Sequence, residues 1–298
     1  MSTSFLTRSA HAAFSIANAS LSRQIASTTA NTSFKSPVFC RFMSSIADSE
    51  HKLMTEVFPD PAKVSSFIGK SVPQAISNLA KADAVCFDVD STVIQEEGID
   101  VLADSLGKGA EVSAWTTKAM DGNVKFEDAL AARLDIIRPS KSDIQKCLIE
   151  HPCKLSPGID TLVKELLSRG TDVFFVSGGF RIMIEPVADK VGVDHSRIYA
   201  NTILFDENTG DYTGFDQNEP TSADMGKPRA LKMIKENGGY QTMVMVGDGA
   251  TDAQANPPAD SFVGFGGVTE REAVKEKACW YVYDFEDMIK VVKNSEKS

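Results

Sequence analysis

The chain has 298 residues, of which 42% are hydrophobic, an ordinary share for a globular protein of one or two domains. It carries a net charge of -10 at pH 7, which argues against a nucleic-acid partner because a phosphate backbone would be repelled. No run of about eighteen apolar residues occurs, so we expect no membrane-spanning segment. Binding of a small phosphorylated substrate is still possible, since one local cation can outweigh distant surface charge.

Residues 1–47 differ in composition from the rest of the chain. They contain no Asp or Glu, are rich in Ser, Thr and Ala, and carry four basic residues, Arg8, Arg23, Lys35 and Arg41. This composition is typical of an organelle transit peptide, and its many Ser and Thr favour the chloroplast, with the mitochondrion as the alternative. We expect the segment to be removed in the mature protein. A plain disordered tail is the competing interpretation.

The segment 48–94 is expected to begin the core domain. Apolar positions at helical spacing between Leu53 and Lys81 predict two short helices, interrupted near Pro73. The run Ala84–Phe87 is apolar without alternation, which indicates a strand buried on both faces of a parallel sheet. Asp88 and Asp90 follow it and should point to the same side, because side chains alternate along an extended chain.

Two later apolar runs also end in small or acidic residues. The run Asp172–Val176 leads into Ser177, Gly178 and Gly179, and the run Met243–Val246 leads into Gly247 and Asp248. The carboxyl ends of parallel strands meet at one edge of a sheet, where open α/β sheets bind ligands. We therefore expect these groups to converge there, with Lys227 at the start of a helix over 228–237 and Asp252 one helical turn after Asp248.

The segment 95–156 contains helical patterns and no convincing strand. Phe126, Leu130, Leu134 and Ile137 form one apolar stripe, and Arg133 borders it. Inserted directly after the first strand, such a segment would cover the ligand-binding edge as a helical cap. Residues 157–298 are expected to complete the core. There we predict a hairpin of Ile198–Phe205 with Tyr212–Phe215, strands at Ser261–Gly266 and Cys279–Tyr283, and a closing helix from Glu286.

These ordered motifs resemble a known superfamily. Asp88-Val89-Asp90-Ser91-Thr92-Val93, then Ser177, Lys227 and Gly247-Asp248-Gly249-Ala250-Thr251-Asp252, are similar to the motifs of the haloacid dehalogenase superfamily of phosphotransferases. Within this superfamily, the longer segments around these motifs resemble the phosphoserine phosphatase family. These segments are Phe87–Asp100, Val176–Phe180 and Gly247–Asp252, and the similarity extends from about Asp83 to Glu286. The resemblance implies an α/β fold with a Rossmann-like parallel sheet core and an inserted helical cap.

The resemblance also implies a covalent mechanism with Mg²⁺. Asp88 would be the nucleophile and Asp90 the proton donor, which requires burial beside a like charge to raise the pKa of Asp90. The metal would be held by Asp88, Asp248 and the main-chain carbonyl of Asp90, and a set of oxygen donors suits Mg²⁺ better than zinc. Asp252 would orient Lys227 or a metal-bound water.

The remaining implied residues bind the substrate, O-phosphoserine. The phosphoryl group would be held by Ser177, Gly178, Gly179 and Lys227, with Thr251 nearby. Glu97 and Arg133 match the family positions that recognise the ammonium and carboxylate groups of the substrate. Met120, Asp121 and Phe126 would line the site, although many family members have Gly where Asp121 stands.

The activity implied is hydrolysis of O-phosphoserine to serine and phosphate, the last step of phosphorylated serine biosynthesis. Three other hypotheses stay open: a phosphatase or phosphotransferase for another small phosphate ester, a catalytically silent ligand-binding domain on the same fold, and a metal-dependent nuclease. Against the nuclease hypothesis, the chain lacks the basic surface that binding of a polyanion requires. The sequence does not determine the oligomeric state, and a homodimer is possible.

Overall fold

The computed structural model describes residues 37–120 and 124–295, and the side chains of 47–115 and 124–295. The chain divides into two compact units, Met1–Ser49 and Glu50–Ser298. Most of the predicted leader, residues 1–36, lies outside the described residues. Among the helices described, none is both long and apolar enough to cross a bilayer.

A six-stranded parallel sheet forms the centre of residues 50–298, in the order β3-β2-β1-β6-β7-β8. Its strands are β1 (Ala84–Phe87), β2 (Asp172–Phe180), β3 (Ile198–Asn201), β6 (Met243–Gly247), β7 (Ser261–Phe265) and β8 (Trp280–Val282). The central strand β1 pairs with β2 on one side and β6 on the other. This confirms the α/β class and the expectation that the three apolar runs form neighbouring parallel strands.

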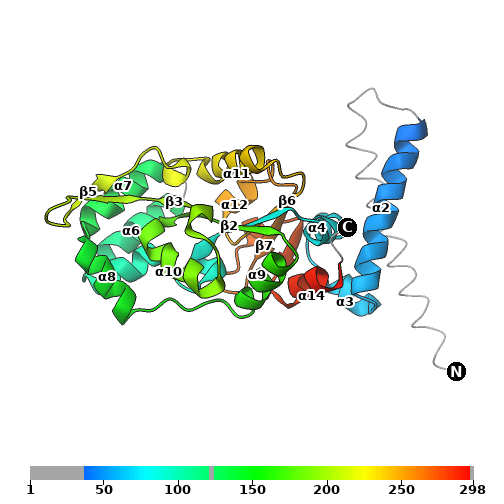
Figure 1. Cartoon of the computed structure of the whole chain (residues 1–298), viewed down its shortest axis with the longest axis horizontal. Coiled ribbons are helices and arrows are strands. Elements are labelled where there is room, and N and C mark those ends of the chain that lie inside the picture. The colour runs from blue at the N-terminus through cyan, green and yellow to red at the C-terminus, as the bar shows by residue number, and fades with distance from the viewer. Residues whose placement is uncertain (1–36, 121–123, 296–298) are drawn as a thin grey trace. The chain divides into compact units, whose positions relative to one another are not determined.

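Helices cover both faces of the sheet (Figure 1). Successive side chains of β1 alternate between faces, so Val85 and Phe87 enter one hydrophobic cluster and Ala84 and Cys86 another. The first cluster is completed by α4 (Val72–Ala80), α9 (Ile159–Ser168), α10 (Arg181–Val191) and α14 (Glu286–Asn294). The second is completed by α11 (Gly226–Gly238), α12 (Ala250–Gln254) and α13 (Glu272–Lys275). Burial on both faces is the reason why β1 shows no polar alternation.

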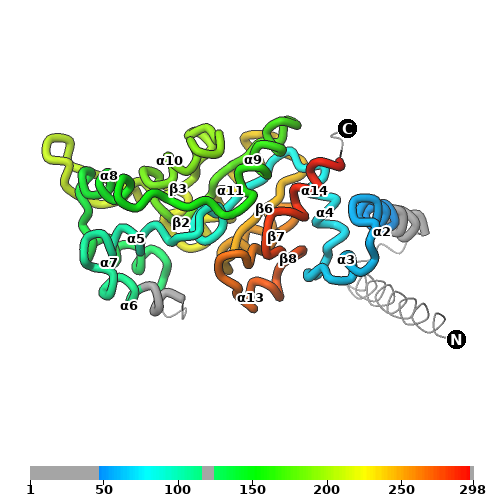
Figure 2. Tube along the Cα trace, turned by 90° about the horizontal axis from the view of Figure 1, so that it is seen from below, coloured from blue at the N-terminus to red at the C-terminus, as the bar shows by residue number. Residues whose placement is uncertain are grey.

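In the described part of the chain between β1 and α9 there are four α-helices. They are α5 (Gly98–Ser105), α6 (Gly109–Met120), α7 (Phe126–Ile137) and α8 (Lys141–Glu150). Figures 1 and 2 both show them grouped together beside β2 and β3. A third hydrophobic cluster joins Leu102, Leu134 and Ile144 of these helices to Ile203 and Tyr212. The helical segment and the β4–β5 hairpin therefore share a core that is separate from the two clusters on the main sheet.

The predicted hairpin was wrong in one respect. The stretch Ile198–Phe205 is not one strand: β3 joins the main sheet, and only β4 (Ile203–Phe205) pairs with β5 (Tyr212–Phe215) in an antiparallel ladder. The chain changes sheets at Thr202, whose hydroxyl donates to Glu219 Oε1 at 2.7 Å. The apolar pattern of the sequence continues through both strands and gives no sign of this change of sheet.

The two short helices predicted between Leu53 and Lys81 are present, but the end of a third helix precedes them and the predicted interruption at Pro73 was wrong. Three helices occur there: the end of α2 (Pro37–Val57), then α3 (Pro61–Ser66) and α4. Pro73 does not interrupt a helix but lies in the first turn of α4. Proline lacks an amide hydrogen, and in the first turn this hydrogen would have no acceptor within the helix. The apolar face of α4 packs on the sheet through Ile76 and Leu79, which are fully buried.

Candidate active site

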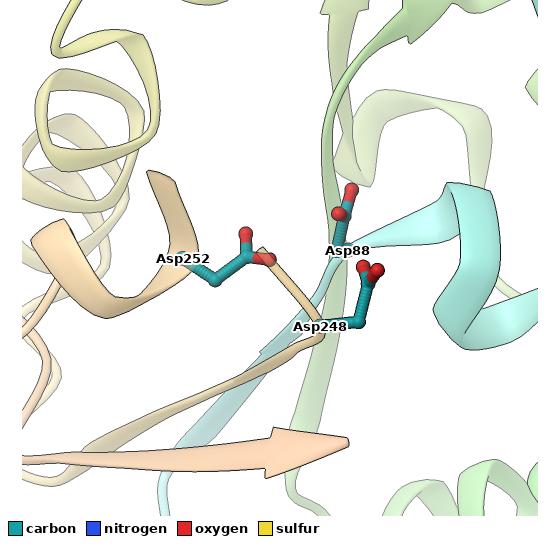
Figure 3. A group of neighbouring side chains, drawn as sticks. All are labelled: Asp88, Asp248 and Asp252. Atoms are coloured by element: carbon teal, nitrogen blue, oxygen red, sulfur yellow. The ribbon is translucent and has the colours of Figure 1, made fainter. Parts of the chain in front are cut away.

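Three aspartates meet at the carboxyl edge of the sheet. Asp88 follows β1, Asp248 follows β6, and Asp252 lies on α12 directly after that loop. All three are buried, and carboxylate oxygens of the three lie within 4.8 Å of one another. Figure 3 shows Asp88 and Asp248 near each other and Asp252 reaching toward them from its helix. The sheet topology brings these residues together as the sequence predicted.

A wide turn after Asp88 brings two more acids to the same edge. Ser91 has a positive φ of 53°, and the Ile94 amide closes the turn by donating to Val89 O at 3.0 Å. The Gly98 amide donates to Asp90 Oδ1 at 2.8 Å, and the Ser91 hydroxyl donates to Glu97 Oε1 at 2.7 Å. Asp90 and Glu97 are thereby fixed beside each other.

Lys227 is the cation that joins the aspartates. It lies in the first turn of α11, is 8% exposed, and its Nζ is 2.7 Å from Asp88 Oδ2 and 2.5 Å from Asp252 Oδ1. Burial by itself would lower the pKa of Lys227, but the carboxylates of Asp252 and Asp88 outweigh it and raise that pKa. Lys227 is therefore charged and held between two carboxylates.

Two of the acids have pKa values near neutrality. Burial, followed by the charges of Glu97 and Asp88, raises the pKa of Asp90 to about 7, against the opposing effects of the Gly98 hydrogen bond and Lys227. Burial and then the charge of Asp88 raise the pKa of Asp252 to about 7, although Lys227 and the Gly249 amide counteract this. At neutral pH each of these groups can both hold and release a proton.

After Val176, within the last residues of β2, the main chain turns closely past Asp90 and α7. Ser177 is fully buried, and its Oγ accepts a hydrogen bond from the Gly179 amide at 2.9 Å. A Cβ atom on Gly179 would lie 2.7 Å from Asp90 Oδ2, and one on Gly178 would lie 3.1 Å from the Phe126 ring. A larger residue at either position would require the Asp90 carboxylate or the Phe126 ring to shift.

Phe126 and Arg133 reach the edge of the sheet from α7. The Arg133 Nε donates to Ala129 O at 3.1 Å. Burial lowers the pKa of Arg133, while the charges of Asp100, Glu97 and Asp90 counteract this. Burial likewise raises the pKa of Glu97, which the Ser91 hydroxyl opposes and the Asp88 charge reinforces. A half-buried cation and a half-buried acid thus lie near Asp90.

Of three further predicted site residues, Met120, Asp121 and Thr251, the structure describes the side chain of Thr251 only. Met120 ends α6, but its side chain lies outside the described residues, as does all of Asp121. Thr251 is exposed on α12, next to Asp252.

Arg271 is a site residue that the sequence analysis missed. Its guanidinium forms an ion pair with Asp248 Oδ2 and donates to the main-chain O of Asp248 at 3.0 Å, while the Thr92 hydroxyl donates to Asp248 Oδ1 at 3.2 Å. A signal was present in the sequence. Arg271 follows the carboxyl end of β7 shortly downstream, so the rule that selected Asp88 and Asp248 could have selected it too.

The donor set fits a hard divalent cation. The group of Asp88, Asp248 and Asp252 offers carboxylate oxygens only, with no sulfur or imidazole among the atoms that could bind an ion. The site also has an excess of acids. Asp90 adds a fourth carboxyl group, while Lys227 and Arg271 are the only described residues that form ion pairs with the three aspartates.

Comparison with known proteins identifies the family. A model of haloacid dehalogenase-like hydrolases matches residues 82–260. The chain belongs to the haloacid dehalogenase-like hydrolase family. It is 50% identical over 209 residues to a protein of Arabidopsis thaliana named phosphoserine phosphatase, chloroplastic, with 70% of each chain covered.

Two further comparisons point to the same group. The chain is 50% identical over 208 residues to phosphoserine phosphatase of Bos taurus, which covers 70% of this chain and 92% of the bovine one. A solved structure described as a phospho-aspartyl intermediate analogue of phosphoserine phosphatase is similar with a TM-score of 0.60 at 29% identity, over 70% of this chain and 98% of that one. The resemblance noted from the sequence motifs is confirmed.

Replacement of Lys227 by Met tests the electrostatics of the site. The variant leaves Asp88 and Asp252 buried without their cation, so in EDTA at pH 8 we expect it to lower the free energy of unfolding by about 3–5 kcal/mol. The pKa of Asp252 rises further without Lys227, so the folded state binds protons more tightly than the unfolded state. The loss of stability should therefore shrink as the pH falls from 8 to 5.

Lys232→Met is the matched control for this measurement. Lys232 lies on the same helix, with a side chain 67% exposed and 3.8 Å from Glu236. A change of about 0.5 kcal/mol or less is expected for it in denaturant unfolding at either pH. Equal losses for Lys227→Met at pH 5 and pH 8 would contradict the buried ion-pair account.

Proposed function

We propose that the chain is a Mg²⁺-dependent phosphoserine phosphatase that hydrolyses O-phospho-L-serine through an aspartyl-phosphate intermediate. The observation that carries the proposal is the convergence of Asp88, Asp90, Lys227 and Asp248 at one edge of the sheet, in a chain about half identical to proteins of that name. This constellation supplies a nucleophile, an acid and a cation for a phosphate monoester.

Asp88 is the proposed nucleophile. Its carboxylate attacks phosphorus, the bond to the serine oxygen breaks, and an acyl phosphate forms on the side chain. The nearby ammonium of Lys227, 2.7 Å from Asp88 Oδ2, offsets part of the repulsion between this carboxylate and the phosphate dianion. Mg²⁺ bound by Asp88, Asp248 and the main-chain carbonyl of Asp90 would supply the remaining positive charge.

Asp90 is the proposed acid and base. A carboxyl group with a pKa of about 7 is substantially protonated at neutral pH and can give its proton to the departing serine oxygen. The carboxylate that results can then take a proton from the water that hydrolyses the acyl phosphate. The Gly98 amide, which donates to Asp90 Oδ1, leaves Oδ2 on the side of Gly179.

The turn at Ser177, with Lys227, is the proposed binding site of the phosphoryl group. The Ser177 hydroxyl, the amides of Gly178 and Gly179, and the Lys227 ammonium offer donors to its oxygens, and these interactions strengthen as charge accumulates on them. In this proposal Asp252 does not react. Its carboxylate, 2.5 Å from Lys227 Nζ, holds the ammonium in position.

Selectivity is assigned to the helical segment 95–156, which we propose acts as a cap. Glu97 would pair with the substrate ammonium and Arg133 with its carboxylate, as oppositely charged partners for a zwitterion. Phe126, packed against Gly178, would form an apolar wall. Met120, Asp121 and Thr251 complete the proposed substrate-binding set.

We further propose that the enzyme works in the chloroplast, in the last step of serine biosynthesis, with the mitochondrion as the alternative location. Support comes from the Ser-rich leader without acidic residues, and from the Arabidopsis relative named as chloroplastic. A homodimer is compatible with this role.

A substrate panel with an Arg133→Ala variant tests the proposed specificity. Phosphate release with Mg²⁺ should be fastest from phosphoserine among small phosphate esters. The variant should lose about tenfold or more in kcat/KM for phosphoserine because the substrate carboxylate loses its partner. Its kcat/KM for p-nitrophenyl phosphate should stay within about threefold of wild type, since that substrate has no carboxylate. A preference for a phosphosugar would favour the alternative ester phosphatase, and equal losses on both substrates would remove Arg133 from recognition.

Asp90→Asn tests the proton donor. Single-turnover release of serine should fall by about 10²–10⁴-fold, while release of nitrophenolate, which leaves without a proton, should fall much less. In wild type the rate with phosphoserine should decline as the pH rises through the pKa of Asp90, because the protonated acid is then lost. Rapid-mixing measurements on both substrates decide the point. Similar losses for the two leaving groups would contradict the assignment.

A further inference from the structure

The ladder between β2 and β3 is interrupted beside the proposed phosphoryl site. Val176 pairs with Tyr199 and Phe180 pairs with Asn201, and the register shifts between these pairs. The main chain of Ser177, Gly178 and Gly179 consequently bulges out of the ladder, and its polar groups need partners other than β3 backbone groups.

The side chain of Asn201 provides one such partner. Its Nδ2 donates to the main-chain O of Gly178 at 2.8 Å, and its Oδ1 accepts from the Thr221 hydroxyl at 3.1 Å. Asn201 is fully buried and Thr221 is 2% exposed. Since the Thr221 hydroxyl donates to Oδ1, the amide is oriented with Nδ2 toward Gly178.

The anchored carbonyl determines where the next amide points. Among the described residues only two peptide bonds are cis, and the bond between Gly178 and Gly179 is not one of them. In a trans peptide the C=O and the N–H point in opposite directions. With Gly178 O held by Asn201, the Gly179 N–H faces the other way, toward Ser177 Oγ at 2.9 Å and on the side of Asp90.

We propose that Asn201 is a positioning residue, which aims the Gly179 N–H at the phosphoryl oxygens by holding the Gly178 carbonyl. The inference rests on the proposed function of the turn at Ser177. Two adjacent glycines leave the intervening peptide free to rotate, so the main chain alone does not fix this donor. A donor stabilises the developing charge well only if it is already oriented before the reaction, and Asn201 with Thr221 supplies that orientation.

Asn201→Leu removes the donor without adding charge. Calorimetric binding of vanadate in the presence of Mg²⁺ should weaken by about tenfold or more, and kcat/KM should fall similarly for phosphoserine and for p-nitrophenyl phosphate, because the phosphoryl group is common to both. Thr221→Val, which only releases the orientation of the amide, should give a smaller loss in the same direction. Thr221→Ser retains a hydroxyl and should restore vanadate affinity.

Asn78→Leu is the matched structural control. Asn78 is also a buried amide, 6% exposed, and its Nδ2 donates to Ser261 Oγ at 2.7 Å, at the opposite end of β7 from the site. This variant should lower the melting temperature without changing vanadate affinity. Mn²⁺ binding, measured by electron paramagnetic resonance, should be retained in every variant.

The outcomes separate this inference from the proposed function. Wild-type vanadate affinity in folded Asn201→Leu would overturn the inference. If that variant does not fold, unchanged affinity in Thr221→Val would overturn it instead. A wild-type enzyme inactive on phosphoserine would overturn the proposed substrate, whereas a vanadate affinity that still depends on Asn201 would support the role of Asn201 at the phosphoryl site.

Discussion

The site is organised by one buried cation between two carboxylates. Lys227 is held 2.7 Å from Asp88 and 2.5 Å from Asp252, and all three side chains are largely withdrawn from water. Burying any one of these charges alone would cost several kcal/mol, so each depends on the others. The triad also joins the end of β1 to the beginnings of α11 and α12. These two buried ion pairs therefore constrain how the three elements approach one another.

The parallel sheet makes this arrangement possible. Because β1 lies between β2 and β6, the residues that follow these strands meet without any long loop. The groups proposed for the chemistry belong to the strand ends and the helices that follow them. By contrast, Phe126 and Arg133, proposed for substrate recognition, lie on α7, which packs in a separate hydrophobic cluster. Such a division would let the helical segment vary with the substrate while the strand ends keep the reaction unchanged.

The sequence predicted those features that depend on local pattern. Apolar runs without alternation identified β1, β2 and β6, and the polar residues directly after them identified Asp88, Ser177 and Asp248. The split of Ile198–Phe205 between two sheets could not be predicted in this way, because it depends on strand pairing that only the folded chain shows. Asn201 was missed for a related reason, because its hydrogen bond to Gly178 shows only in the folded chain. Arg271 could have been selected from its place after β7, but its contact with Asp248 also shows only in the folded chain.

The central claim is that phosphorus is transferred to Asp88 before it reaches water. Hydrolysis of a phosphorothioate analogue of phosphoserine, made chiral at phosphorus by the sulfur and an oxygen isotope, in water of a third oxygen isotope, tests this claim most directly. Two successive in-line displacements predict overall retention of configuration in the thiophosphate product. Inversion would mean direct attack by water and would contradict the account.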